Sequence, residues 1–140
     1  DAMPRVSLKR LEIMLGGLQG KRIALFGVSY RQDVGDTRYS PSETFFHAAV
    51  EKGAVVVAHD PMVVKWTELG IDLDPAFPVA SSIDAAVFAV PHQEYREIDI
   101  VAWTNGAKPV VLDANNVLSP KQYEELRFVG CSVQSIGIGE

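Results

Sequence analysis

Five strongly apolar stretches, separated by segments of helical character, constrain this fold most. "RIALFGV" (22–28), "AVVVAHD" (54–60) and "IDAAVFAV" (83–90) are almost continuously apolar. Such runs are typical of strands that are buried on both faces, as in parallel sheets. We expect a fourth strand in "KPVVLDANNVL", with Asp113 at its end, and a last strand in "CSVQSIGIG".

The segments between the apolar runs have helical patterns. Residues 7–21 carry leucines at steps of three and four (Leu8, Leu11, Leu15 and Leu18), and Gly20 is a plausible stop. Further helices are expected over 40–53, 98–107 and 119–130, with a weaker one over 62–70. Strand–helix alternation predicts a mostly parallel sheet with right-handed crossovers and helices on both faces. The predicted fold is an α/β, Rossmann-like three-layer sandwich, preceded by an N-terminal helix.

The helix over 40–53 has a clear start signal. Ser40 is a favoured N-cap, Pro41 suits the first helical position, and Glu43 stands where it would complete a capping box. Gly53 is expected to end the helix. The loop before it therefore leads directly into a helix N-terminus.

Composition narrows the classes of function. With 140 residues, 47% hydrophobic content and a net charge of −5, the chain suits one domain and lacks the basic stripe of nucleic-acid binders. It has no apolar run long enough for a membrane span and no signal-peptide pattern, so the cytoplasm is the expected location. A single cysteine, Cys131, excludes an internal disulfide and a multi-cysteine metal site. Because "DAMPRV" does not begin with Met, we expect a cut from a longer chain or a cloning remnant.

Ligands of parallel α/β sheets lie beyond the carboxyl ends of the strands, here loops 27–40, 59–64, 90–95 and 113–119. The first of these loops carries Tyr30, Arg31 and Arg38 and leads into a helix N-terminus, where amides and guanidinium groups favour an anion such as a nucleotide diphosphate. An equal alternative is that the arginines only brace the loop against Asp33 and Asp36. We favour bracing for Arg38, since "GDTR" places an acid two residues before it.

Other polar residues give weaker signals. Asp60 is better explained as a turn-forming residue before proline than as a ribose ligand, because the first loop lacks a glycine fingerprint. His92 follows the third strand, where a ligand contact is possible, whereas His47 and His59 are expected to be structural. Cys131 has the neighbours of a core thiol. No catalytic, cofactor-binding or metal-binding residue is expected in this chain.

An ordered set of motifs resembles the C-terminal domain of the UDP-glucose/GDP-mannose dehydrogenase family. That family has a strand, then G-x-(A/S)-(F/Y)-K-x-(D/N)-x-(D/G)-D-x-R-x-S-P, a helix and a strand ending in D-P. The matching positions are Gly27, Ser29, Tyr30, Asp33, Asp36, Arg38, Ser40, Pro41, Asp60 and Pro61. "PHQEY", "DANN" and "SIGIG" resemble later family segments, so the resemblance covers about residues 20–140.

This resemblance implies an NAD-dependent enzyme that oxidises the C6 alcohol of a UDP- or GDP-linked sugar to a carboxylate, as in polysaccharide biosynthesis. In that family an N-terminal domain binds NAD, a middle segment supplies a catalytic cysteine and lysine, and a central helix carries a homodimer interface. Residues 1–19 would be the end of the linker or central helix, with no local partner for its apolar face. Residues 20–140 would be the nucleotide-sugar-binding C-terminal domain, inactive in isolation.

The family's site residues transfer by position. Tyr30, Arg31 and Asn115 would bind substrate, and Asp36, Arg38 and Ser40 would shape the loop. Two positions depart from the family: Arg31 replaces a lysine, and Asn115 replaces the arginine of D-x-R-N. These departures leave an alternative open, a non-catalytic nucleotide-sensing or assembly module of the same fold.

Overall fold

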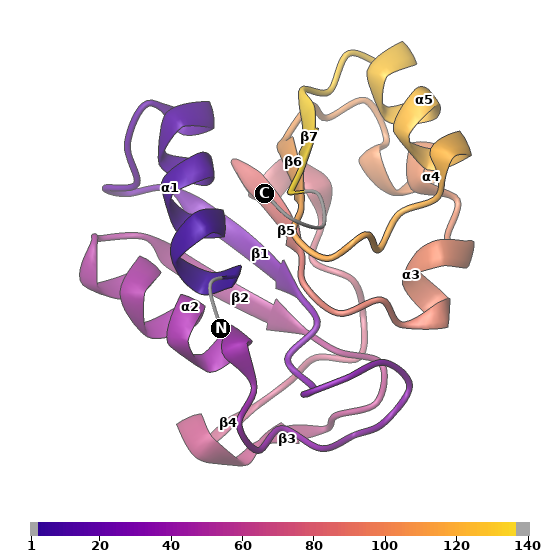
Figure 1. Cartoon of the computed structure of the whole chain (residues 1–140). Coiled ribbons are helices and arrows are strands. Elements are labelled where there is room, and N and C mark those ends of the chain that lie inside the picture. The colour runs from indigo at the N-terminus through magenta and orange to yellow at the C-terminus, as the bar shows by residue number, and fades with distance from the viewer. Residues whose placement is uncertain (1–2, 137–140) are drawn as a thin grey trace.

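A parallel five-stranded sheet forms the centre of the protein (Figure 1), whose computed structural model describes residues 3–136. The strands are β1 (Arg22–Phe26), β2 (Val55–His59), β5 (Ala85–Phe88), β6 (Val110–Asp113) and β7 (Val133–Ser135). Their order is β2-β1-β5-β6-β7, and every neighbouring pair is parallel. The predicted α/β sandwich is confirmed, although part of the last predicted strand (137–139) lies outside the described residues.

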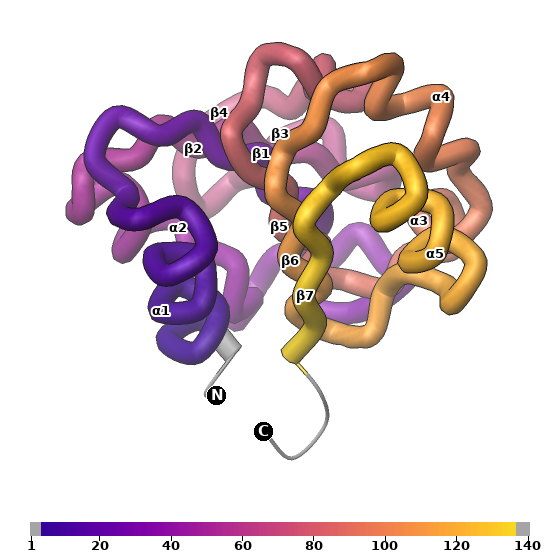
Figure 2. Tube along the Cα trace, turned by 90° about the horizontal axis from the view of Figure 1, so that it is seen from above, coloured from indigo at the N-terminus to yellow at the C-terminus, as the bar shows by residue number. Residues whose placement is uncertain are grey.

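Helices cover both faces of the sheet (Figure 2). Successive residues of a strand point to opposite faces, and both sets are apolar here, so each face needs a covering layer. On one side α1 (Met3–Leu15) and α2 (Pro41–Glu51) pack over Ile23 and Leu25. On the other side α3 (Gln93–Glu97), α4 (Ile100–Thr104) and α5 (Pro120–Phe128) pack over Ala24 and Phe26. The strands are thus apolar throughout because both of their faces are core.

Helix α1 belongs to this domain's own helical layer. It ends at Leu15, and Gly16 follows with φ +72°. Leu8 and Leu11 are buried, and the helix packs against α2 and β6. The expectation that its apolar face has no local partner is therefore wrong.

Two short segments also differ from the sequence predictions. In place of a helix over 62–70, β3 (Lys65–Trp66) pairs antiparallel with β4 (Ile71–Asp72) around a 3-10 turn, η1 (Thr67–Leu69). The side chain of Trp66 is fully buried, so tertiary packing outweighs the weak helical signal. Helix α3 begins at Gln93, within the expected loop 90–95, and a further 3-10 turn, η2, spans Ala80–Ser82. Within residues 3–136, no helix combines the length and apolarity needed to cross a membrane.

Helix α2 starts where the sequence predicts, with the predicted N-cap and proline but without the predicted capping box. Ser40 is the N-cap and Pro41 opens the helix, with Ser40 Oγ accepting from the N–H of Ser42 at 3.2 Å. Glu43 does not complete a capping box; its carboxylate lies 3.7 Å from His47. The full capping box forms instead at the start of α5, between Ser119 and Gln122.

Candidate functional site

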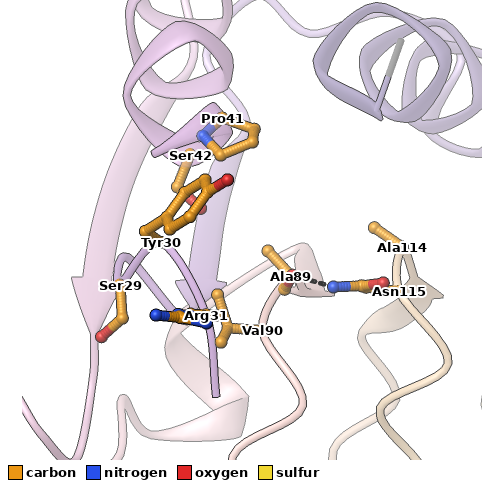
Figure 3. A pocket seen from close by; sticks show the side chains of 9 residues that line it. All are labelled: Ser29, Tyr30, Arg31, Pro41, Ser42, Ala89, Val90, Ala114 and Asn115. Carbon is orange, nitrogen blue, oxygen red and sulfur yellow. Dashed lines mark hydrogen bonds between the residues drawn. The ribbon is translucent and has the colours of Figure 1, made fainter. Parts of the chain in front are cut away.

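A cavity of about 400 Å³ lies where β1, β5 and β6 end and α2 begins. This is the edge at which ligands of parallel α/β sheets bind. Figure 3 shows the side chains that line it. They are Ser29, Tyr30, Arg31, Pro41, Ser42, Ala89, Val90, Ala114 and Asn115.

The cavity contains all three residues predicted to bind substrate. Tyr30 and Arg31 reach it from the loop after β1, and Asn115 from the loop after β6. Tyr30 is half exposed, and its N–H donates to the carbonyl of Asp36 at 2.6 Å. Among the described lining residues Arg31 is the only charged one, so the cavity has a cationic side and no carboxylate.

Arg38, in contrast, serves the loop. Its Nε and Nη2 donate to the two carboxylate oxygens of Asp36 at 3.0 and 2.8 Å. The Arg38 side-chain hydrogen bonds lower the pKa of Asp36 from 3.8 to about 2. Arg38 is also outside the set of residues that line the cavity. The two arginines therefore play separate parts: Arg38 pairs within the loop, whereas Arg31 faces the open space.

The start of α2 forms a second wall. Ser42 Oγ donates to the carbonyl of Gly27 at 2.8 Å, which ties the helix start to the end of β1. Pro41 and Ser42 both line the cavity. Amides in the first turn of a helix and the helix dipole attract anions. Pro41 has no N–H, Ser42 N donates to Ser40 Oγ and Glu43 N donates to the carbonyl of Ser40, so this wall contributes the helix dipole and Arg31 supplies the positive charge.

Asn115 forms the wall at β6. Its side-chain Nδ2 donates to the carbonyl of Ala89 at 3.1 Å, as Figure 3 shows, and its N–H donates to Asp113 Oδ1 at 3.2 Å. The amide group is thus partly used in bridging the loops after β5 and β6. It brings no positive charge to this side of the cavity, unlike the arginine of the family pattern.

Asp60 directly follows β2, and its carboxylate accepts hydrogen bonds from the first loop. Its Oδ2 accepts from Val28 N, Ser29 N and Ser29 Oγ, and its Oδ1 accepts from Met62 N at 2.8 Å. Burial alone would raise the pKa of Asp60, but hydrogen bonds, the largest from His92, hold it below its usual value. The Met62 bond makes the turn that the sequence predicts before Pro61.

NAD does not fit this edge of the sheet. A dinucleotide fold would need close glycines after β1 and an accessible acid after β2. Here the loop reads "GVSYRQ", and Asp60 is buried beneath its protein donors. The loop after β1 and Asp60 therefore lack the features of a dinucleotide site.

His92 does not line the cavity. It is fully buried, Nε2 lies 2.9 Å from Asp60 Oδ2, and Nδ1 accepts from Asp33 N at 2.8 Å. The hypothesis of a direct ligand contact by His92 is therefore wrong for this structure. His59 is also buried, with Nδ1 2.9 Å from the hydroxyl of Tyr95, and burial lowers its pKa.

Neither the cysteine nor the potential metal ligands of the described residues form a catalytic site. Cys131 is buried, and burial raises the pKa of its thiol, as expected for a core cysteine. Across the part of the chain that the structure describes, no three His, Cys, Asp or Glu residues gather as a metal site.

Sequence reasoning missed the small side chains of the cavity, namely Ser29, Ser42, Ala89, Val90 and Ala114. Each of these residues follows a strand or starts a helix. The sequence therefore indicates that they lie at the edge of the sheet, but their small side chains do not indicate a ligand. It also missed the pairing of Asp60 with His92, 32 positions apart in the chain.

Comparison with known proteins agrees with this geometry. Residues 24–120 match the family described as "UDP-glucose/GDP-mannose dehydrogenase family, UDP binding domain". The chain belongs to this family. The match includes Tyr30, Arg31, Asn115 and the rest of the cavity lining, so the cavity lies within the family's UDP binding domain.

Relatives in the family are dehydrogenases of nucleotide-linked sugars. The UDP-glucose 6-dehydrogenase of Rickettsia bellii is 29% identical over 118 residues, 79% of this chain and 27% of that protein. The UDP-N-acetyl-D-mannosamine dehydrogenase of Methanocaldococcus jannaschii is 30% identical over 132 residues, covering 91% of this chain and 30% of that protein. A solved NDP-N-acetyl-D-galactosaminuronic acid dehydrogenase from Methanosarcina mazei Go1 superposes with a TM-score of 0.79 at 27% identity, covering 96% and 28% of the two chains. The chain thus spans less than a third of each of these relatives.

Proposed function

We propose that this chain binds the nucleotide half of a UDP- or GDP-linked sugar in the cavity beside Tyr30 and Arg31. The single observation that carries the proposal is that Arg31 lines the cavity together with the start of α2, while Arg38 is paired with Asp36. Arg31 supplies the charge for the diphosphate, since a guanidinium matches phosphate oxygens in pairs. The half-exposed ring of Tyr30 offers a surface against which the base or ribose packs.

Replacing Arg31 with alanine is expected to weaken UDP binding about tenfold or more. The reason is the loss of a charge-assisted contact, which is worth about 1.5–3 kcal/mol. Isothermal titration calorimetry with UDP and GDP measures the change, and the difference should shrink as salt screens the ions.

Arg127→Ala is the matched control for this experiment. It removes the same charge from α5, where the guanidinium lies over the Tyr123 ring and away from the cavity lining. We expect this variant to bind UDP as the unsubstituted chain does. Equal binding by Arg31→Ala and the unsubstituted chain would contradict the phosphate role of Arg31.

The proposed setting is a longer NAD-dependent nucleotide-sugar 6-dehydrogenase that oxidises the sugar C6 alcohol to a carboxylate. In that setting residues 20–140 are the nucleotide-binding domain, and residues 1–19 are the end of the linker or central helix, with α1 packed onto α2 and β6. NAD, the catalytic cysteine and the lysine belong to other parts of such an enzyme, which we propose to be a cytoplasmic homodimer. The support is the family membership and the poor fit of NAD to the end of β1.

The chain by itself is expected to produce no NADH from NAD and UDP-glucose. Its described residues include one cysteine, Cys131, which is buried and carries a raised thiol pKa. Absorbance at the NADH band over hours, with a complete family enzyme as the positive control, is the measurement. Sustained turnover by the 140-residue chain would contradict this assignment of parts.

Asn115 favours a second candidate, a non-catalytic nucleotide-sensing or assembly module. A neutral amide bonded to Ala89 stands where the family has an arginine, so the affinity for a dianionic diphosphate falls. The complete reading frame distinguishes the candidates. A glycine-rich βαβ start and a Cys–Lys segment upstream support the enzyme, and a free-standing frame supports the module.

A further inference from the structure

Within the loop 27–40, the segment 28–33 that carries Tyr30 and Arg31 is bonded at each of its ends to one buried side-chain pair, Asp60 and His92. On the near side, Val28 N and Ser29 N donate to Asp60 Oδ2 at 2.8 and 3.0 Å. On the far side, Asp33 N donates to the ring of His92 at 2.8 Å. The residues between these two attachments, 30–32, form an arch over the Asp60–His92 pair.

The hydrogen bonds define how the imidazole of His92 is protonated. A backbone N–H only donates, so Nδ1 accepts from Asp33 and carries no proton. The ring proton is therefore on Nε2, which donates to Asp60 Oδ2 at 2.9 Å. The imidazole thus joins the carboxylate that follows β2 to an amide of the first loop in one fixed orientation.

Other groups also surround the imidazole, among them Asp33 Oδ1, which lies 3.7 Å from Nδ1. Asp33 Oδ1 accepts from Gln93 N at 3.1 Å, which adds a second bond between the first loop and the start of α3. Asp33 also has φ +58°, a conformation that residues other than glycine seldom adopt, and these bonds hold it there. The ring of Tyr95 packs edge-on against His92 at 5.6 Å between centroids.

We propose that His92 is a positioning residue of the nucleotide site, which acts through Asp33 and Asp60 to set the arch that bears Tyr30 and Arg31. It is fully buried and touches no open part of the cavity, so it contacts no ligand. The proposal rests on the proposed nucleotide function of that arch. It assigns the family-like His-x-x-Tyr segment a task that its position after β5 does not reveal.

Two substitutions separate the roles of the two ring nitrogens. His92→Asn keeps an acceptor near the place of Nδ1, for Asp33 N, and loses the donor to Asp60. His92→Gln keeps a donor near the place of Nε2, for Asp60, and loses the acceptor for Asp33. Asp60 Oδ2 retains three other donors in either case, at Val28 N, Ser29 N and Ser29 Oγ.

We expect His92→Gln to weaken UDP binding about three- to tenfold in calorimetry, the scale of a lost hydrogen bond in the arch. His92→Asn should bind within about twofold of the unsubstituted chain. A merely structural role predicts equal losses in both variants, because both remove the imidazole. Equal losses, or unchanged binding by His92→Gln, would overturn the proposal.

Amide hydrogen exchange at Asp33 tests the attachment without any ligand. The amide should be protected in the unsubstituted chain and in His92→Asn, and exposed in His92→Gln. If the unsubstituted chain bound neither UDP nor GDP, the proposed function would fail, and the exchange pattern alone would then decide the attachment.

A measurement on the unsubstituted chain covers the case in which a variant does not fold. The nitrogen spectrum of the His92 ring should show a protonated Nε2 and a bare Nδ1, as the hydrogen bonds to Asp60 and Asp33 require. A proton on Nδ1, or rapid exchange of the Asp33 amide, would overturn the proposal.

Discussion

Replacing Gly27 with alanine is expected to destabilise the protein by about 3 kcal/mol or more and to remove nucleotide binding. Gly27 has φ +106°, and a methyl group there would lie 2.7 Å from Val90 Cβ and 2.8 Å from Val90 N. The backbone conformation alone costs a non-glycine residue about 1–2 kcal/mol, and overpacking a rigid neighbour adds about 1–3 kcal/mol. Because Val90 lines the cavity, relief of the clash moves a wall of the site.

Thermal unfolding measures the first effect, and a drop of about 10 °C corresponds to it in a domain of this size. Gly17→Ala is the matched control, since Gly17 has φ +125° but no atom beyond its two chain neighbours lies within 4 Å of the place that its new methyl group would take. That variant should suffer the backbone cost alone and bind UDP normally. If both variants lost the same stability, the close approach of β1 to Val90 would not be what requires glycine at position 27.

The sheet was predictable because its strands are buried on both faces. Ile23 to Phe26 and Ala85 to Phe88 are fully buried, so nothing polar interrupts the apolar runs. Elements that depend on a tertiary partner were not predictable. The strand at Lys65–Trp66 exists because Trp66 enters the core, and neighbouring residues show no alternation that marks it.

The place of the cavity and its charged lining residue were predictable from the sequence, but the buried hydrogen bonds that hold its first loop were not. A loop with Tyr30 and Arg31 between a buried strand and a Ser-Pro helix start indicates an anion site from local sequence alone. The strand order β2-β1-β5 then brings the end of β2 and the loop after β5 to either side of that loop. Only this order joins Asp60 to His92, and no local pattern near either residue carries that information.

Two buried aspartates at strand ends, Asp60 and Asp113, hold the loops that form walls of the cavity. Asp113, at the end of β6, accepts from Val117 N and Leu118 N and from the hydroxyl of Tyr123. Asp60 does the equivalent for the loop after β1. Each buried carboxylate gathers backbone donors that the loop cannot satisfy within itself. The cavity therefore lies between two loops, and in each loop backbone N–H groups donate to a buried aspartate at a strand end, Asp60 or Asp113.

Replacing Asp60 with asparagine is expected to have the other large effect, a loss of about 3 kcal/mol or more in the free energy of unfolding. Asp60 is buried, and its Oδ2 accepts from Val28, Ser29 and His92. An asparagine offers one carbonyl oxygen, so its NH₂ group would face a donor on one side. Hydrogen bonds to a charged group contribute about 1.5–3 kcal/mol, and a buried group left unpaired costs about 1–3 kcal/mol. Urea unfolding at pH 7 measures the loss.

The pH dependence of unfolding should identify Asp60 as the cause. Its carboxyl pKa is lowered in the folded protein, because hydrogen bonds from His92, Val28 and Met62 outweigh the effect of burial. A lowered pKa stabilises the fold above the unfolded value of about 4, and that contribution is lost as the pH falls through the folded value. The unsubstituted chain should therefore lose stability below about pH 4, and Asp60→Asn should lose less over the same range.

Asp74→Asn, at an exposed site whose carboxylate accepts one N–H, is the control and should unfold within about 0.5 kcal/mol of the unsubstituted chain. Equal pH dependence of the free energy of unfolding in the unsubstituted chain and Asp60→Asn would contradict this role of Asp60. It would mean that protonation of the Asp60 carboxylate is not coupled to unfolding.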